Sequence, residues 1–198
     1  MRYFLPLILI IAAACVYVIE NNKTETPIAT TSEVSSPIEY DRRLYKHWVD
    51  QDKDCQDTRQ EVLISESIEP VILDDKGCRV VSGLWEDPFT GNTYTDPSDL
   101  DIDHMVPLKE AHLSGAHLWS QSRREQYAND LSHSDSLIAV SKSANRSKGA
   151  KDVAQWLPTN EAFHCEYVKR WVGIKDRWGM TMDVTESDAV DTLLSGCN

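Results

Sequence analysis

The sequence predicts an α+β fold, with short strands in its middle and helices concentrated at its end. Apolar segments rich in β-branched residues and bounded by turn residues recur between residues 67 and 140. From Phe163 to Trp178, apolar residues repeat at the 3.6-residue spacing of an amphipathic helix. The chain has 198 residues, 41% hydrophobic and 26% charged, which fits one globular domain and excludes collagen-like, coiled-coil and wholly disordered proteins.

The first 20 residues have the pattern of an export signal or a short membrane anchor. Arg2 precedes a mostly apolar run from Phe4 to Ile19, which as a helix would span about 24 Å. The charge asymmetry predicts that the remaining chain is exported, and so is secreted, periplasmic or anchored to the outer face of the cytoplasmic membrane. Cys15 follows three alanines, which leaves a lipoprotein as an alternative. Residues 21–39 are predicted to be a flexible linker, so the membrane is expected as a partner only through the N-terminal segment.

The folded domain is predicted to span residues 40–198, and its elements follow from local signals. Residues 44–49 and 58–64 favour helices, the second opened by Asp57 with Gln60 three residues later, a capping-box pattern. Residues 67–73 and 78–85 favour a hairpin around the turn Asp74–Gly77. The remaining expected elements are a turn at 87–91, strands at 100–108 and 137–140, and helices at 120–130, 143–156 (interrupted near Gly149), 163–178 and 185–194.

The charge distribution restricts where a polyanion could bind. The formal net charge of −12 argues against a protein that binds nucleic acid through its overall charge. Residues 104–178, however, hold 11 Lys or Arg against 8 Asp or Glu. A nucleic-acid site is therefore expected only in this middle segment.

Four of the five cysteines lie in the domain, and an exported chain favours disulfides between them. Three pairings are open, and we favour the short-range one, Cys55 with Cys78 and Cys165 with Cys197. The competing interpretation, a zinc ion bound by cysteines, lacks the usual Cys-x2-Cys spacing.

Two segments carry the residue types that phosphodiester hydrolysis needs. Asp101-Ile-Asp-His-Met-Val-Pro-Leu108 is a strand with two carboxylates and an imidazole, and Ser136–Gly149 is a strand that runs into a helix. On that helix, Asn145 and Lys148 are three residues apart and so share a face. Asp103 and Asn145 offer oxygen ligands to a hard divalent cation, and His104 is a base that titrates near neutral pH. The layout is strand, strand, helix.

Asp-His-x-x-Pro followed by Asn-x-x-Lys resembles the HNH endonucleases with the ββα-metal fold. More specifically, DIDHMVPLKEAHLSGA, YAND, LIAVSKSANRSKGAKD, QWLP and the Gly83–Gly91 stretch resemble the exported, disulfide-bearing HNH-type proteins of bacteria. This resemblance covers nearly all of residues 40–198. It implies a ββα-metal core at about residues 100–156, with an N-terminal helix and hairpin extension, C-terminal helices and two disulfides.

The resemblance also implies roles for individual residues. His104 would be the general base, and Asp103 and Asn145 would bind Mg2+ or Mn2+. Phosphate contacts would come from the basic residues of the second segment, Lys142, Arg146 and Lys148. Ser136 stands nine residues before Asn145, where the family has the Asn that orients the base. The implied function is a metal-dependent endonuclease acting on nucleic acid, DNA more than RNA.

Adjacent residues on a regular strand point to opposite faces, so Asp103 and His104 can converge on one metal only if the strand bends or ends there. Asp101 shares a face with Asp103, which makes it an alternative ligand.

Other interpretations stay open at several positions. Asp50, Asp52, Asp54 and Glu61 match positions 1, 3, 5 and 12 of a calcium-binding EF-hand loop, although Cys55 replaces the glycine at position 6. A structural calcium ion there competes with a solvated acidic turn. A solvated face is the favoured interpretation of Arg123, Arg124 and Lys142. A zinc site of His104, His112 and His117 lacks the usual spacing. For the whole protein, the alternative is a non-catalytic, surface-displayed nucleic-acid-binding module with a nuclease-like fold.

Overall fold

The computed structural model of the chain describes residues 39–197. The predicted signal or anchor at 1–20 and nearly all of the predicted linker at 21–39 lie outside these residues. Within the described part, no helix combines the length and the apolar character needed to cross a bilayer.

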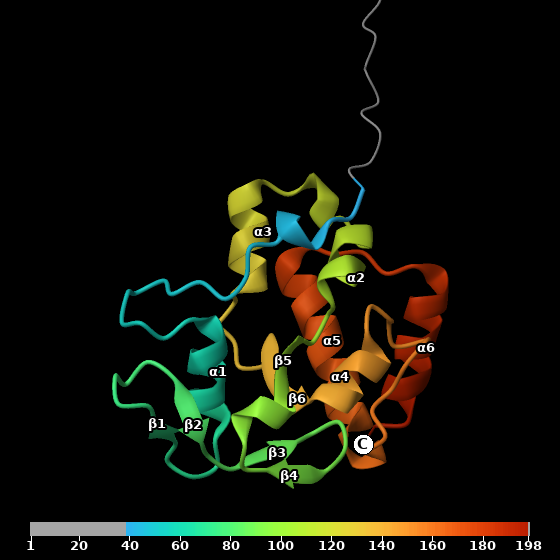
Figure 1. The fold of residues 1–198 in the computed structure, drawn as a ribbon. Coiled ribbons are helices and arrows are strands. Elements are labelled where there is room, and N and C mark those ends of the chain that lie inside the picture. The colour runs from blue at the N-terminus through green and yellow to red at the C-terminus, as the bar shows by residue number, and fades with distance from the viewer. Residues whose placement is uncertain (1–38, 198) are drawn as a thin grey trace, which may run out of the picture. The chain divides into compact units, whose positions relative to one another are not determined.

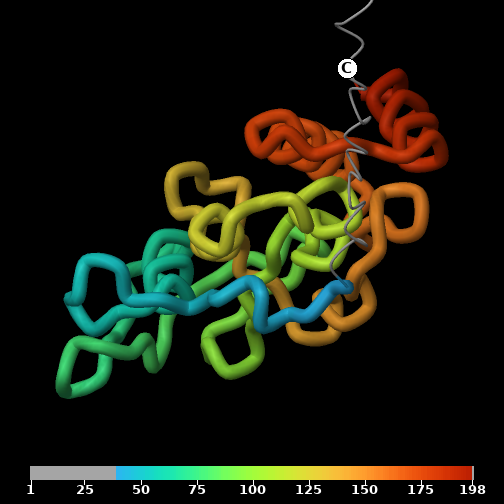
Figure 2. Tube along the Cα trace, turned by 90° about the horizontal axis from the view of Figure 1, so that it is seen from above, coloured from blue at the N-terminus to red at the C-terminus, as the bar shows by residue number. Residues whose placement is uncertain are grey.

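The fold is α+β, as the sequence predicts, and Figure 1 shows its elements. The α-helices are α1 (Thr58–Glu66), α2 (Leu108–Leu113), α3 (Gln121–Ala128), α4 (Lys142–Lys148), α5 (His164–Trp178) and α6 (Val184–Ser195). The strands form three two-stranded antiparallel sheets: β1 (Ile72–Leu73) with β2 (Val80–Ser82), β3 (Trp85–Asp87) with β4 (Asn92–Tyr94), and β5 (Leu100–His104) with β6 (Leu137–Ser141). Short 3-10 helices lie at Arg42–Leu44, Pro97–Asp99, Ala116–Leu118 and Glu161–Phe163. In Figure 2, α5 and α6 lie at one end of the domain, and α1, β1 and β2 lie at the other.

The sheet of β5 and β6 is central, and α4 follows β6 without a loop. Leu100 pairs with Ser141 and His104 with Leu137, so the register is regular along the whole of β5. Ser141 caps α4 by accepting from the Ala144 amide, and Gly149, with φ +59°, ends the helix. The predicted order of strand, strand and helix is therefore observed.

Both faces of this sheet are buried. Ile102 and Ala139 pack with Val62 and Leu63 of α1 in one apolar cluster. On the opposite face of β6, Ile138 and Val140 belong to a larger cluster that includes α2, α3 and α5. All five residues of β6 are buried, which explains why Leu137–Val140 form an uninterrupted apolar run.

A buried sheet of only two strands leaves an outward row of backbone groups on each strand without a neighbouring strand. On β6, the Ala139 amide donates to Glu66 Oε2 (2.6 Å) and the Ser141 amide donates to Asp87 Oδ2 (3.1 Å). On β5, the Leu100 carbonyl accepts from the Arg59 guanidinium, and the His104 carbonyl accepts from the Lys148 ammonium (2.8 Å). Carboxylates therefore satisfy two of the outward amides of β6, and cations satisfy two of the outward carbonyls of β5.

Asp87, in the Gly83–Gly91 stretch, has a structural role. Its fully buried carboxylate accepts from the Phe89 amide (2.8 Å) and the Thr90 hydroxyl (2.8 Å) within the β3–β4 turn. The same carboxylate also accepts from Ser141. The turn is thus attached to the start of α4.

The predicted helix at residues 44–49 is wrong. Only Arg42–Leu44 form a 3-10 turn, and Trp48 has φ +58°, which a right-handed helix excludes. The Asn129 side chain donates to the Lys46 carbonyl (2.8 Å) and accepts from the Val49 amide (3.1 Å). These tertiary hydrogen bonds replace the ones that a helix would make.

The helix predicted at 143–156 ends at Lys148, because Gly149 terminates it, and the strands predicted at 67–73, 78–85 and 100–108 are shorter than expected. The remaining predicted elements are confirmed within a few residues, and so are the disulfides. Cys55 is bonded to Cys78, and Cys165 is bonded to Cys197. Asp57 caps α1, but the Gln60 side-chain oxygen accepts from the Val80 amide and not from the Asp57 amide as a capping box would require. The β3–β4 pair and α2 were not predicted, because their segments are short and lack a clear periodicity.

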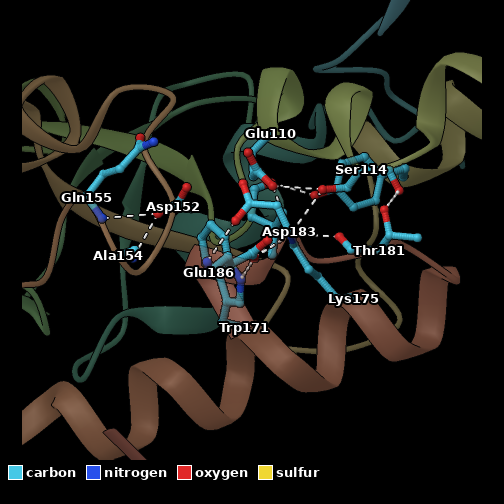
Figure 3. Close-up of polar contacts among 12 residues, drawn as sticks. Glu110, Ser114, Asp152, Ala154, Gln155, Trp171, Lys175, Thr181, Asp183 and Glu186 are labelled. Atoms are coloured by element: carbon cyan, nitrogen blue, oxygen red, sulfur yellow. Dashed lines mark hydrogen bonds and ion pairs between the residues drawn. The ribbon is translucent and has the colours of Figure 1, made fainter. Parts of the chain in front are cut away.

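A fully buried lysine holds α5 to α2 and to α6 (Figure 3). Lys175 donates to Glu110 Oε1 (2.8 Å) and Ser114 Oγ (3.0 Å), and it is ion-paired with Glu186. Glu186 also accepts from the Trp171 indole (2.6 Å). Polar satisfaction is nearly complete in the described part of the chain, where the Tyr167 hydroxyl alone is buried without a hydrogen bond.

We expect Lys175→Met to lower the free energy of unfolding by roughly 3 to 5 kcal/mol, because it leaves two carboxylates without their cation. Denaturant unfolding of Lys169→Met, an exposed lysine on the same helix, provides the matched control. A loss below about 1 kcal/mol would show that the cluster contributes little.

The buried Glu66 carboxyl should make the free energy of unfolding depend on pH. Burial raises the pKa of Glu66 to about 7, against the Ala139 hydrogen bond and Arg170, which lower it. Since the folded-state pKa lies above the unfolded one, the neutral carboxyl stabilises the fold at low pH, and this contribution is lost as the pH rises from about 4.5 through 7.

Glu66→Gln keeps an acceptor for the Ala139 amide and carries no charge. Relative to wild type, we expect it to gain stability between pH 4.5 and 7, by up to ~1.4 kcal/mol per pH unit and about 3 kcal/mol in all. Thermal or urea unfolding across this range measures the difference. Glu69→Gln, which removes an exposed carboxylate nearby, is the control; an equal gain there would rule out the local cause.

Candidate functional site

His104 is the last residue of β5, and its side chain is held in one orientation. The residue is only 6% exposed, and its Nε2 donates to the Ala128 carbonyl at the end of α3 (3.0 Å). A carbonyl oxygen can only accept, so Nε2 carries the proton and Nδ1 is the unprotonated nitrogen. Within residues 39–197, Nδ1 makes no hydrogen bond. The imidazole is therefore oriented as a base whose Nδ1 lone pair is unused.

The surroundings keep this imidazole neutral. The pKa of His104 is lowered to about 3. Burial is the largest cause, and the nearby Arg42, His47 and Lys148 also lower the pKa, whereas the Ala128 hydrogen bond raises it. The Trp48 ring is stacked against the imidazole, with centroids 5.8 Å apart. An anion bound beside the ring would raise its pKa again.

The opposite face of β5 carries the two carboxylates, and α4 contacts both. Asn145 Nδ2 donates to Asp101 Oδ2 (3.0 Å), and Lys148 Nζ donates to Asp103 Oδ2 (2.5 Å). These two pairs follow each other along the interface between β5 and α4. Asp101, the alternative ligand expected from strand alternation, is thus the carboxylate that meets Asn145.

Lys148 is fully buried, and its side chain bonds to other buried groups. Its ammonium bonds to Asp103 and to the His104 carbonyl. Burial raises the pKa of Asp103, and the Lys148 ammonium opposes that shift. Of the other predicted phosphate contacts, Arg146 is exposed and Lys142 is partly exposed. The substrate roles of all three stay predictions.

The convergence of Asp103, His104 and Asn145 on one point also stays a prediction. β5 does end at His104, as that convergence requires, but the residue is still in register with Leu137. The Asp103 and Asn145 side chains have different partners, and the imidazole leaves the strand on the other face. Base and ligands are therefore neighbours in sequence on two faces of a narrow sheet.

Ser136 contributes its hydroxyl to a different group. Ser136 Oγ donates to Asp130 Oδ2 (2.8 Å), and its carbonyl accepts from the Met105 amide. Asp130 also accepts from Trp178 Nε1 (3.2 Å). Ser136, at the position taken by Asn in the family, thus holds the loop before β6, and the Ala128 carbonyl orients the imidazole instead.

The donor set at the β5–α4 interface suits a hard divalent cation. It consists of two carboxylates and one amide oxygen, and no hydrogen bond from residues 39–197 reaches Asn145 Oδ1. An ion there would have to compete with Lys148 for Asp103. Asp101 and Asn145 are the pair that could hold it without breaking the buried ion pair.

In the acidic loop before α1, three of the four residues of the EF-hand pattern lie together. Carboxylate oxygens of Asp50, Asp52 and Asp54 lie within 4.8 Å of one another, and all three side chains are exposed. Cys55 adopts φ +77°, the left-handed conformation that the pattern assigns to glycine. Burial raises the pKa of Glu61, and these three carboxylates raise it further. Calcium binding here stays a prediction.

Sequence reasoning missed the residues that fasten the N-terminal segment beside His104. Asn129 is the most connected, since its amide also accepts from the Thr58 hydroxyl (2.9 Å). The prediction of a solvated Arg124 is wrong: it is 7% exposed and donates to the Leu44 and Trp119 carbonyls. Only the YAND string in the resemblance hinted at Asn129.

Two adjoining hollows of about 620 and 900 Å³ run along α3. Gln126, Asp130 and Trp178 line both. They border the end of α3 that holds the imidazole, but His104 lines neither. The candidate site therefore lies at the end of β5, outside both hollows.

Comparison with known proteins places the chain in a family. Residues 42–189 match the family described as GmrSD restriction endonucleases, C-terminal domain. An "Uncharacterized secreted protein" of the fungus Arthroderma benhamiae is 35% identical over 158 residues, which cover 80% of this chain and 76% of that protein. The resemblance is thus not confined to bacterial proteins. No solved structure matches. The chain belongs to the family of GmrSD restriction endonuclease C-terminal domains.

Proposed function

We propose that the protein is a metal-dependent endonuclease of the HNH type that hydrolyses phosphodiester bonds of nucleic acid, DNA more than RNA. Membership in a restriction endonuclease family supports a nuclease-like function and nucleic acid as a partner. The observation that carries the proposal is His104: its ring is fixed by Ala128 as a neutral imidazole at the end of a strand whose other face bears two carboxylates.

In this proposal, His104 Nδ1 takes the proton of the attacking water. The Ala128 carbonyl keeps the proton on Nε2, so that only Nδ1 can act as the base. The negative charge of a bound phosphate would raise the imidazole pKa toward the range in which proton transfer is efficient. Trp48, stacked on the ring, would limit access of bulk water to it.

Mg2+ or Mn2+ would be held by the oxygen donors between β5 and α4: Asp101, Asn145 and, after release from Lys148, Asp103. When bound, such an ion supplies stabilisation of the charge that develops on the phosphate and on the departing oxygen. The chain's own part is to hold the donors in place through α4.

One observation favours a second candidate, a non-catalytic binding module with this fold. The Asp103 carboxylate is buried and already neutralised by Lys148, which reduces its availability to a metal ion. Such a protein would retain nucleic acid without cleaving it.

Export is the proposed destination. The relative is called secreted, and the described domain carries two disulfides, which are typical of oxidising compartments.

We expect the full-length protein, with its disulfides formed, to nick supercoiled plasmid in the presence of Mg2+, and we expect a chelator to abolish nicking. His104→Ala should abolish nicking because it removes the base, and gel electrophoresis of the plasmid measures it. Retardation of the plasmid without cleavage would select the binding module instead.

Since His104 is buried, folding needs its own check. Circular dichroism and thermal unfolding should show that His104→Ala remains folded. His104→Asn is a second variant whose amide can still donate to Ala128. A folded His104 variant with the wild-type nicking rate would refute the assignment of the base.

Asn145→Ala should raise the Mg2+ concentration for half-maximal nicking by ~10-fold or more, because it removes an oxygen donor. A metal titration of the nicking rate measures this change. Ser143→Ala, on an exposed position of the same helix, is the control. Identical titration curves for Asn145→Ala and wild type would remove Asn145 from the metal site.

A further inference from the structure

The N-terminal segment of the domain brings a second histidine and an arginine to the candidate base. The His47 ring lies perpendicular to the His104 ring, with centroids 6.4 Å apart. Arg42 Nη2 is 3.4 Å from His47 Nε2, and both residues lower the pKa of His104. A histidine and an arginine therefore lie near the imidazole, although they come from a segment about 60 residues earlier in the sequence, a separation that no local pattern could bridge.

This juxtaposition is built by α3, the same helix that orients His104. Arg124 Nε and Gln121 Nε2 both donate to the Leu44 carbonyl. Asn129, directly after α3, fixes the segment at both Lys46 and Val49. Since Ala128 holds the imidazole, one short stretch of chain sets the position of His104 relative to the 42–49 segment. Figure 1 shows this segment lying against α3.

The backbone between these anchors is strained where it meets the imidazole. Trp48 has φ +58°, a conformation that is costly for a bulky side chain. The hydrogen bonds of Val49 and Thr58 to Asn129 hold it there. As a result, the Trp48 ring lies over His104, and His47 lies beside it.

Arg42 differs from its neighbour Arg43 in what it pairs with. Arg43 donates to both carboxylate oxygens of Asp41. Arg42 is exposed, and within residues 39–197 it forms no ion pair; its side chain contacts the Tyr40 side chain and His47 Nε2 instead. His47 Nδ1 donates to the Tyr45 carbonyl (2.8 Å), which leaves Nε2 as the nitrogen that faces Arg42. The guanidinium thus lacks an anionic partner.

We propose that Arg42 and His47 form the subsite that binds a backbone phosphate of the nucleic acid beside His104. The inference rests on the proposed function and names its substrate contact. A phosphate would replace the neutral imidazole as acceptor for Arg42, because charge-assisted, bidentate guanidinium–phosphate pairs are stronger than a 3.4 Å contact to a ring nitrogen. The role assigned by resemblance to Lys148, which is buried, then belongs to residues outside the strand–strand–helix core.

The test is binding of a fluorescein-labelled DNA oligonucleotide, single-stranded and duplex, to the full-length protein in chelator, so that no cleavage is needed. Fluorescence anisotropy across a salt series gives Kd and its salt dependence. We expect Arg42→Ala to raise Kd roughly tenfold and to reduce the slope of log Kd against log salt by about 1. Arg43→Ala, which removes the same charge one residue away, should change Kd by less than about twofold.

His47→Ala should also raise Kd because Arg42 loses a contact that positions it, and His47→Gln, whose side-chain oxygen can still accept from Arg42, should restore part of the affinity. Equal losses for Arg42→Ala and Arg43→Ala, or none for either, would overturn the inference. If the wild type cleaves plasmid while Arg42→Ala binds DNA as tightly as wild type, the subsite alone is wrong. If the wild type neither binds nor cleaves, the proposed function fails and the subsite fails with it.

Discussion

The central constraint on this fold is that a sheet of only two strands is buried on both faces. Its outward amides and carbonyls have no neighbouring strand, and unsatisfied buried backbone groups are costly. Glu66 and Asp87 accept from the outward amides of β6, and Arg59 and Lys148 donate to the outward carbonyls of β5. The charged residues around the candidate site are thus required by the architecture before any chemistry is considered.

This constraint changes how the Asn-x-x-Lys pattern is interpreted. Lys148 completes the edge of β5 and neutralises Asp103, so its burial is explained without a substrate. Asn145, one turn earlier, meets Asp101 at the accessible end of the same interface. In our proposals, metal binding is therefore assigned to Asp101 and Asn145, and phosphate binding to Arg42, which has no carboxylate partner among residues 39–197.

Sequence patterns predicted the elements whose signals are local. The cap at Asp57, the apolar run of β6 and the amphipathic α5 each depend on residues within one turn or one strand. The helix predicted at 44–49 failed because Asn129 and Arg124, about 80 residues away, bind its backbone. Likewise, the partner of the imidazole is the Ala128 carbonyl, and a backbone group leaves no trace in a sequence motif.

The sequence by itself determined the α+β class, the order of strand, strand and helix, and the residue types available for catalysis, while it left three disulfide pairings open. Only the tertiary structure decided which of those residues meet. Strand alternation sends Asp103 and His104 to opposite faces, and the packing of α4 and α3 then selects Lys148 for one and Ala128 for the other. Side-chain partners are set by contacts between distant segments, and a linear pattern encodes spacing along the chain but not distance across the core.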